Sequence, residues 1–248
     1  MRFHPLGLLL LAAASGTVLA EDAPPPPPPW SGEASAGVIV TTGNSESATV
    51  NAKAEVVYQS ERWRNTLTAA TIKTEQEDLA TGEDVRTAER YLIGNKTDFN
   101  FTGRDYAFLA LEFEKDLVGP VRERTSETAG YGRKVLTGPA HLLEAELGAG
   151  ARQTEAQITG EKDDDLIGRA RIAYKWNFTD TSYFGETLKA ESGESNTFTE
   201  SVTELRLSLV GRLFALASYT VRSNSDVPPG TEKTDTVTAL SLGWTFGK

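Results

Sequence analysis

Apolar and polar residues alternate along most of the chain. The clearest cases are residues 48–58 and 167–178, where one set of alternate positions is mainly apolar or aromatic and the other mainly polar or charged. The apolar set comprises Ala48, Val50, Ala52, Ala54, Val56 and Tyr58, and then Ala170, Ile172, Tyr174, Trp176 and Phe178. A period of two predicts a β-strand with one apolar and one wet face. About twelve such strands of about ten residues predict an all-β, antiparallel transmembrane β-barrel.

The N-terminal residues have the features of a secretory signal peptide. Arg2 precedes an apolar run over residues 6–14, and Val18-Leu19-Ala20 fits a small-residue cleavage site. The run is shorter than the roughly 20 apolar residues of a transmembrane helix. Prolines fill residues 24–29 and favour a stiff polyproline II spacer. We therefore expect a signal peptide (1–20), a periplasmic spacer (21–29) and an outer-membrane barrel (30–248).

Connections of two kinds separate the predicted strands. Short turns are expected near 60–62, 102–105, 137–140, 179–181 and 210–212. Longer, more charged loops are expected near 74–84, 115–124, 154–165 and 225–235, with tight turns at 43–45 and 192–196. In outer-membrane barrels the short turns are periplasmic, and an even number of strands returns both chain ends to that side.

Aromatic residues gather next to the predicted periplasmic strand ends. We expect Trp30, Trp63, Trp176, Trp244 and Phe246 to form an aromatic girdle at the membrane–water boundary, which such rings prefer. The same ends also carry Tyr58, Phe99, Phe101, Tyr106, Phe108, Phe178, Tyr183, Phe184 and Phe214. A soluble β-sandwich has no reason to place its rings at one end of the strands.

Composition excludes several function classes. The formal charge is −10, and it becomes −11 when Arg2 leaves with the signal peptide, so no surplus of cations exists for nucleic acid. The chain has no cysteine, which removes disulfides, thiol catalysis, cysteine zinc sites and a lipoprotein anchor. We predict no cofactor, no metal site and no catalytic residue.

The polar face of the predicted strands carries both signs of charge. By the alternation, the lumen-lining residues are Lys53, Glu55, Glu112, Glu114, Glu144, Glu146, Arg152, Arg169, Arg171, Lys175, Glu204 and Arg206. In one interpretation these charges pair across the lumen and plug it, because buried charges need partners. In the other, they line a narrow water-filled pore that selects small solutes. The alternation alone leaves both open.

Two further features could carry chemistry. A lipid-hydrolysing barrel needs a histidine base, and His141 is the only histidine after residue 20; it lies beside a predicted periplasmic turn, away from surface lipid. Asp163-Asp164-Asp165 with Glu161 forms an acidic segment, but its spacing does not match a calcium-binding EF-hand. We expect a solvated acidic loop.

Several short motifs follow one another in a set order along the chain. They are Gly32 with Thr42-Gly43-Asn44-Ser45, Arg124 followed by Gly130-Tyr131-Gly132, the segment 147–152, and the segment 224–229 leading to Asp235. With these motifs the chain resembles the YdiY-type family, described as salt-induced outer-membrane proteins, over about residues 30–246. The resemblance implies an outer-membrane location, and it supplies no catalytic residues.

The expected function is that of a non-enzymatic outer-membrane protein, either structural or a narrow solute channel, with a link to salt or osmotic stress. A lipid-modifying hydrolase and a soluble lipocalin-like binder are the alternatives. Expected partners are outer-membrane lipid, lipopolysaccharide, the outer-membrane assembly machinery and small solutes, and no nucleic acid.

Overall fold

The computed structural model describes residues 29–41, 47–78, 81–227 and 229–247, which form twelve strands. The predicted signal peptide (1–20) and almost all of the spacer (21–29) lie outside the described residues. The strands are β1 Trp30–Thr41, β2 Ser47–Gln59, β3 Trp63–Glu77, β4 Asp84–Asn100, β5 Asp105–Asp116, β6 Val121–Thr137, β7 His141–Ala156, β8 Lys162–Asn177, β9 Tyr183–Ser192, β10 Thr197–Ser208, β11 Leu213–Asn224 and β12 Thr234–Phe246. The described residues include no helix long and apolar enough to cross a membrane.

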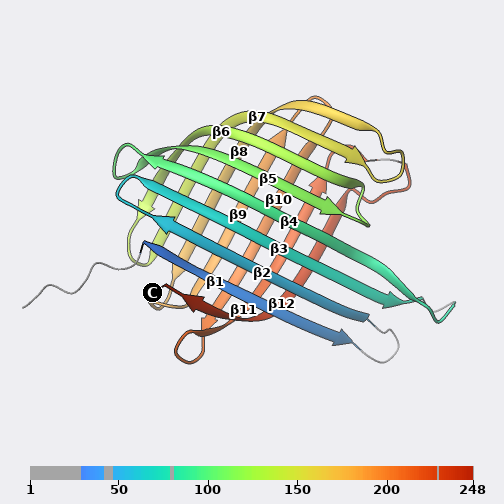
Figure 1. The fold of residues 1–248 in the computed structure, drawn as a ribbon, viewed down its shortest axis with the longest axis horizontal. Coiled ribbons are helices and arrows are strands. Elements are labelled where there is room, and N and C mark those ends of the chain that lie inside the picture. The colour runs from blue at the N-terminus through green and yellow to red at the C-terminus, as the bar shows by residue number, and fades with distance from the viewer. Residues whose placement is uncertain (1–28, 42–46, 79–80, 228, 248) are drawn as a thin grey trace, which may run out of the picture.

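The strands close into one barrel (Figure 1). Each strand pairs antiparallel with its neighbours in sequence, and β1 pairs with β12 to close the ring. Closure pairs both edges of the sheet along part of the β1–β12 seam, and the backbone groups of the other strands are paired within the wall. The prediction of an all-β, antiparallel barrel of about twelve strands is confirmed.

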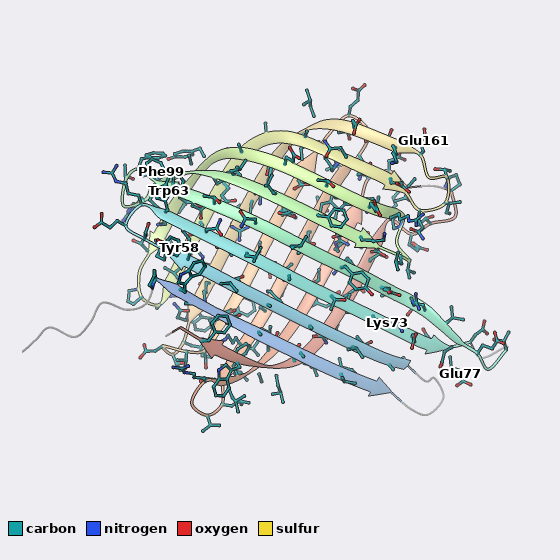
Figure 2. All side chains as sticks on the ribbon, viewed as in Figure 1. Tyr58, Trp63, Lys73, Glu77, Phe99 and Glu161 are labelled. Atoms are coloured by element: carbon teal, nitrogen blue, oxygen red, sulfur yellow. The ribbon has the colours of Figure 1, made fainter. Side chains whose placement is uncertain are left out.

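The two ends of the barrel differ. The start of β1 and the end of β12 lie at the same end of the barrel, at the left in Figure 1. This end also carries the connections 60–62, 101–104, 138–140, 178–182 and 209–212. We call this the turn end and the opposite one the loop end. Figure 2 places Tyr58, Trp63 and Phe99 at the turn end, and Glu77 and Glu161 at the loop end.

Three of the predicted long loops are shorter than expected. The strands continue to Glu77, Asp116 and Ala156, so the connections that follow them span only 78–83, 117–120 and 157–161. The acidic run 163–165 was expected in a loop and instead lies in β8, where Asp165 accepts hydrogen bonds from Arg152 and Ser195. Strand pairing needs only backbone groups, so it extends past the point where the apolar alternation ends.

Alternation along each strand separates the two faces of the wall. Leu147 is 68% exposed on the outer face, whereas the adjacent Glu146 is 2% exposed inside the barrel. Val50, Leu166 and Leu240 are exposed in the same way. A protein that presents large apolar side chains outward and buries its charges inward has the polarity of a transmembrane barrel.

The seam between β1 and β12 is incompletely paired. Pairing runs from Gly32↔Phe246 to Ala36↔Leu242, whereas β1 pairs with β2 over its full length. Beyond Ala36 the side chain of Asn51 bridges the seam: its amide donates to the Gly37 carbonyl at 3.5 Å, and it accepts from Ser241 at 2.6 Å. The loop-end half of the seam is therefore held by side chains.

Candidate functional site

Ion pairs cross the barrel interior. Lys53 on β2 lies 2.7 Å from Glu204 on β10, and Lys189 on β9 lies 2.5 Å from Glu112 on β5. Neither pair of strands is adjacent in the sheet. These side chains therefore meet in the lumen, and alternation on both strands points them there.

A layer of paired charges fills the lumen near the loop end. We define this outer charged layer as Glu112, Glu114, Arg124, Lys189, Glu200 and Arg222. Arg222 on β11 pairs with Glu114 on β5 and, at 3.1 Å, with Glu200 on β10. Strands β5 and β11 lie on opposite sides of the ring. The layer therefore spans the full width of the barrel.

A buried aromatic ring lies at the centre of the outer charged layer. Phe198 is 1% exposed, and the Arg124 guanidinium lies 3.9 Å from its ring centroid. Arg222 and Lys189 approach the same ring at 5.0 and 5.6 Å. Three cations lie around one ring, and each is also near a carboxylate of the layer, which offsets the repulsion between the cations. The space left among these residues is only about 10 Å³.

Glu146 is the hub of a second cluster, closer to the turn end. Its carboxylate lies 2.8 Å from Lys96, 3.4 Å from Arg171 and 3.6 Å from Arg169. The Tyr106 hydroxyl donates a hydrogen bond to it at 2.9 Å. A carboxylate that is fully removed from water needs this number of partners.

Rings that were expected at the membrane boundary instead line the lumen. Tyr106, Phe108 and Phe214 are at most 4% exposed, and Tyr183 lies under the Lys175 ammonium group at 3.8 Å. The boundary prediction was wrong for these four. Their positions share the alternation phase of the inward charges, and glycines on neighbouring strands leave room for the rings, as Gly132 does for Tyr106.

Two chambers lie between the outer charged layer and the turn end. One, of about 360 Å³, is lined by both signs of charge, including Lys53, Glu55, Arg64 and Glu144. The other, of about 260 Å³, lies at the mouth of the turn end beside Glu33, Lys175 and Arg206. The lumen is therefore wider toward the turn end and narrowest at the outer charged layer.

The structure places all twelve predicted lumen-lining residues in contacts or cavities of the interior. Lys53, Glu112, Glu114, Glu146, Arg169, Arg171 and Glu204 belong to the ion pairs above. Glu55 lines the larger chamber, Glu144 lies 3.8 Å from Arg64, Lys175 covers Tyr183, Arg152 lies 3.0 Å from Asp165, and Arg206 lies 3.5 Å from Glu33. Whether they line a path for solutes stays a prediction.

Sequence reasoning missed much of the outer charged layer. Arg124, Lys189, Glu200 and Arg222 were not among the predicted lumen residues. The alternation phase alone would have found Lys189, which follows Gly185 and Thr187 on the inner face of β9. Arg222 was missed because Phe214 and Leu216, on the same face of β11, suggested that this face is apolar.

The five predicted girdle residues lie on the outer face at the turn end. Trp30, Trp63, Trp176, Trp244 and Phe246 are 54, 50, 46, 49 and 37% exposed. Trp30 packs against Tyr58 and Trp63 against Phe99, each with ring centroids 4.9 Å apart. The role of these five residues as a membrane girdle stays a prediction.

His141 lies outside the lumen. Its Nδ1 forms a 2.8 Å hydrogen bond with the Tyr174 hydroxyl, and its ring stacks near Trp176 on the outer face. Within the described part of the chain no serine is hydrogen-bonded to it. The described residues contain no group of three or more His, Asp or Glu side chains that could hold a metal ion.

Fold and interior together define a closed, charge-filled antiparallel barrel of transmembrane type. The family described as "Protein of unknown function, DUF481" matches residues 34–246, and the chain belongs to it. The "Uncharacterized protein YdiY" of Escherichia coli (strain K12) is 30% identical over 218 residues, covering 88% of this chain and 83% of that protein. The resemblance expected from the sequence motifs is confirmed.

Solved barrels show a more distant likeness. The NanC porin aligns with a TM-score of 0.48 at 6% identity, covering 86% of this chain and 98% of that one. The translocator domain of the autotransporter NalP from Neisseria meningitidis aligns with a TM-score of 0.46 at 10% identity, covering 91% and 90%.

Proposed function

We propose that the protein is a non-enzymatic barrel of the Gram-negative outer membrane whose lumen is closed to solutes by the outer charged layer. The carrying observation is the set of ion pairs that joins β5, β9, β10 and β11 across the lumen. The exposed apolar outer face supports the location, because a closed barrel satisfies its backbone groups in lipid. The turn end, which carries the five predicted girdle residues, then faces the periplasm.

Cell fractionation tests the location. We expect the full chain in the outer-membrane fraction, with the heat-dependent gel shift that folded barrels show in detergent. Recovery in the soluble periplasmic fraction would overturn the proposal and favour the lipocalin-like alternative.

Planar-bilayer recording tests the closed lumen. We expect refolded protein to show no steady conductance steps. Lys189→Ala with Arg222→Ala removes both cations of Glu200 and the shortest ion pairs of Glu112 and Glu114, so repulsion among these three carboxylates should open a cation-selective path. Reversal potential across a KCl gradient reads the selectivity.

The matched control removes two cations from outside the lumen. Lys115→Ala with Lys162→Ala breaks exposed pairs with Glu123 and Glu155 and should leave the bilayer silent. The proposal fails if the Lys189→Ala, Arg222→Ala protein shows no conductance, or if the control protein conducts. Either result would show that the outer charged layer does not close the barrel.

A narrow solute channel is the second candidate. The chambers of about 360 and 260 Å³ between the outer charged layer and the turn end favour it, because small solutes could reach them from the periplasmic side. Salt screens ion pairs, so this candidate predicts conductance events in the unmodified protein that become more frequent as KCl rises. Such events would replace the closed-barrel proposal and give the salt link a physical basis.

The non-enzymatic assignment rests on His141. Its hydrogen bond to Tyr174 and its place on the outer face at the turn end leave it without the serine partner that hydrolysis requires. Phospholipase activity of the refolded protein that disappears in His141→Ala would overturn this assignment.

A further inference from the structure

The outer face of the barrel carries a carboxylate where lipid is expected. Glu186 on β9 shares the outward phase of Phe184 and Leu188, and Leu188 is 50% exposed. The side chain is partly buried. Charged groups on the lipid face of a barrel are unfavourable, increasingly so toward the bilayer midplane. A carboxylate at this position therefore needs compensation.

Two hydroxyl groups on the neighbouring strand supply part of that compensation. Ser201 donates to one carboxylate oxygen of Glu186 at 2.7 Å, and Thr203 donates to the other at 2.6 Å. Both hydroxyls belong to the outward face of β10, so the three side chains form a fixed polar site on the barrel exterior. The two hydrogen bonds orient the carboxylate but leave its negative charge unmatched.

The height of Glu186 on the wall places it near a membrane boundary. It pairs across the sheet with Tyr174, and the next outward pair toward the turn end is Trp176 with Phe184. Trp176 belongs to the predicted girdle, so Glu186 lies one outward pair inside it, about 5–7 Å along the strand. Girdle rings lie at the level of the lipid headgroups, so Glu186 lies at the inner edge of the headgroup region.

A groove in the outer face begins beside Glu186. It measures about 350 Å³, and Ala170, Ala190 and Ser201 contribute to its lining between the larger Ile172 and Leu188. Ser201 thus belongs both to the groove and to the hydrogen bonds of Glu186. The groove lies on the side of Glu186 away from the turn end, toward the centre of the wall.

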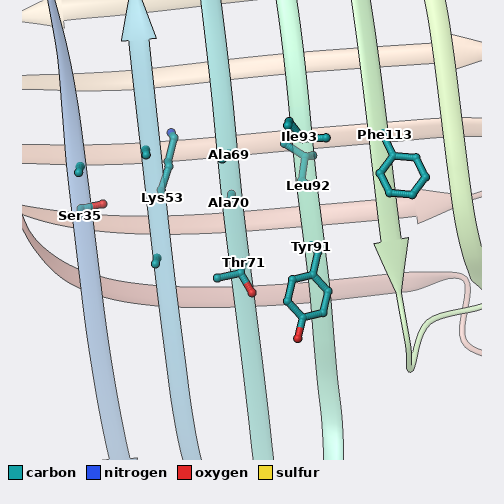
Figure 3. A pocket seen from close by; sticks show the side chains of 12 residues that line it. Ser35, Lys53, Ala69, Ala70, Thr71, Tyr91, Leu92, Ile93 and Phe113 are labelled. Carbon is teal, nitrogen blue, oxygen red and sulfur yellow. The ribbon is translucent and has the colours of Figure 1, made fainter.

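A second, larger groove lacks such a charge. It measures about 500 Å³, and alanines of β1, β2 and β3 face the rings of Tyr91 and Phe113 (Figure 3). Its outward lining has no carboxylate or cation, so nothing there selects a headgroup. The groove beside Glu186 is therefore the more informative of the two.

We propose that Glu186, Ser201 and Thr203 bind the headgroup of a periplasmic-leaflet phospholipid that ends in a primary ammonium, with an acyl chain in the adjacent groove. Charge complementarity selects this occupant: an ammonium group neutralises the carboxylate and donates hydrogen bonds to it. A quaternary ammonium carries the same charge but has no N–H to donate. The inference rests on the outer-membrane orientation proposed above.

Lipid retention from mixed nanodiscs tests the site. The full chain is reconstituted in equal amounts of phosphatidylethanolamine, phosphatidylcholine and phosphatidylglycerol, and lipids retained after gentle extraction are counted by native mass spectrometry. We expect about tenfold preference for phosphatidylethanolamine over phosphatidylcholine, as for one charge-assisted hydrogen bond. Glu186→Gln, which keeps the side-chain shape, should remove most of this preference.

Glu127→Gln is the matched control, because Glu127 is also an outward glutamate and lies on β6 away from this groove. It should keep the preference of the parent. The heat-dependent gel shift reports whether each variant is folded.

Three outcomes would overturn the site: no preference in the parent, equal loss in both variants, or a parent dimer that Glu186→Gln dissociates. The last would identify a second copy of this chain as the occupant. Recovery of the protein in the soluble fraction of cells would instead defeat the proposed location. Lipid retention is measured on purified protein in nanodiscs, so its result does not depend on where the protein is found in cells.

Discussion

Single buried charges in this barrel depend on several partners at once. Glu146 is 2% exposed and lies among Lys96, Arg169 and Arg171, with Tyr106 donating a hydrogen bond. The energy of such a cluster does not divide into separate pairs, because two of the cations also contact other acids: Lys96 lies 2.5 Å from Asp98, and Arg169 lies 3.8 Å from Glu112. Removing one member therefore disturbs several ion pairs at once.

We predict that Glu146→Gln lowers the free energy of unfolding by about 3 kcal/mol, because the buried Arg169 and the partly buried Lys96 and Arg171 lose their common carboxylate. Urea unfolding in lipid vesicles measures the change. Glu161→Gln, in the exposed loop 157–161, should leave the transition where it is. A Glu146→Gln protein as stable as the parent would mean that water already screens the cluster.

Neighbouring strands fit together through glycines and rings. A Cβ added to Gly132 on β6 would lie 2.3 Å from two ring atoms of Tyr106 on β5, and one added to Gly243 on β12 would lie 2.2 Å from the Phe214 ring. The ring of one strand thus occupies the space that a side chain on the next would need. This packing holds Tyr106 in position for Glu146.

We predict that Gly132→Ala destabilises the barrel by about 1–3 kcal/mol, the usual range for overpacking. Gly168→Ala is the control, because a Cβ there meets nothing within 4 Å on the outer face of β8. Heat resistance on gels and urea unfolding report both variants. In a Tyr106→Ala background the Gly132 substitution should become nearly neutral, and an undiminished effect would disprove the proposed contact.

The whole barrel is asymmetric from end to end. The outer charged layer narrows the lumen near the loop end, while chambers widen it toward the turn end. The ring of strands is also uneven around its circumference, since the β1–β12 seam is paired only from Gly32 to Ala36 on β1. Beyond Ala36, toward the loop end, side-chain hydrogen bonds of Asn51 and Ser241 take the place of backbone hydrogen bonds between β1 and β12.

We predict faster hydrogen exchange in the loop-end half of the seam. Backbone amides of residues 37–39 and 237–241 that face the seam should exchange about tenfold faster than those at the same height between β6 and β7, because local opening breaks fewer bonds there. Pairing of β6 with β7 extends from Val121 to Thr137. Equal protection at the two places would show that the seam closes fully in solution.

Alternation made the class of fold and much of the interior predictable. A period of two is a local property, so Glu112 and Glu146 could be placed inside without knowing which strands face each other. Partners on strands that are not adjacent could not be predicted: Lys189 meets Glu112 and Arg222 meets Glu114 only because closure brings distant strands together. The prediction was wrong for Tyr106 and Phe108 although they share the alternation phase of the inward charges, because their place near the strand ends also suits a membrane boundary. Gly132 and Gly148 leave the room that the two rings fill inside the barrel.

Alternation and turn residues act over a few neighbouring positions, so they were enough to predict a barrel of about twelve strands with an apolar outside, a charged inside and two different ends. The tertiary structure was needed to show that the inward charges pair across the lumen and narrow it near the loop end. It also brought Glu186, Ser201 and Thr203 together beside a groove. Both outcomes depend on strand register and on barrel closure, which set the distances between residues far apart in the chain.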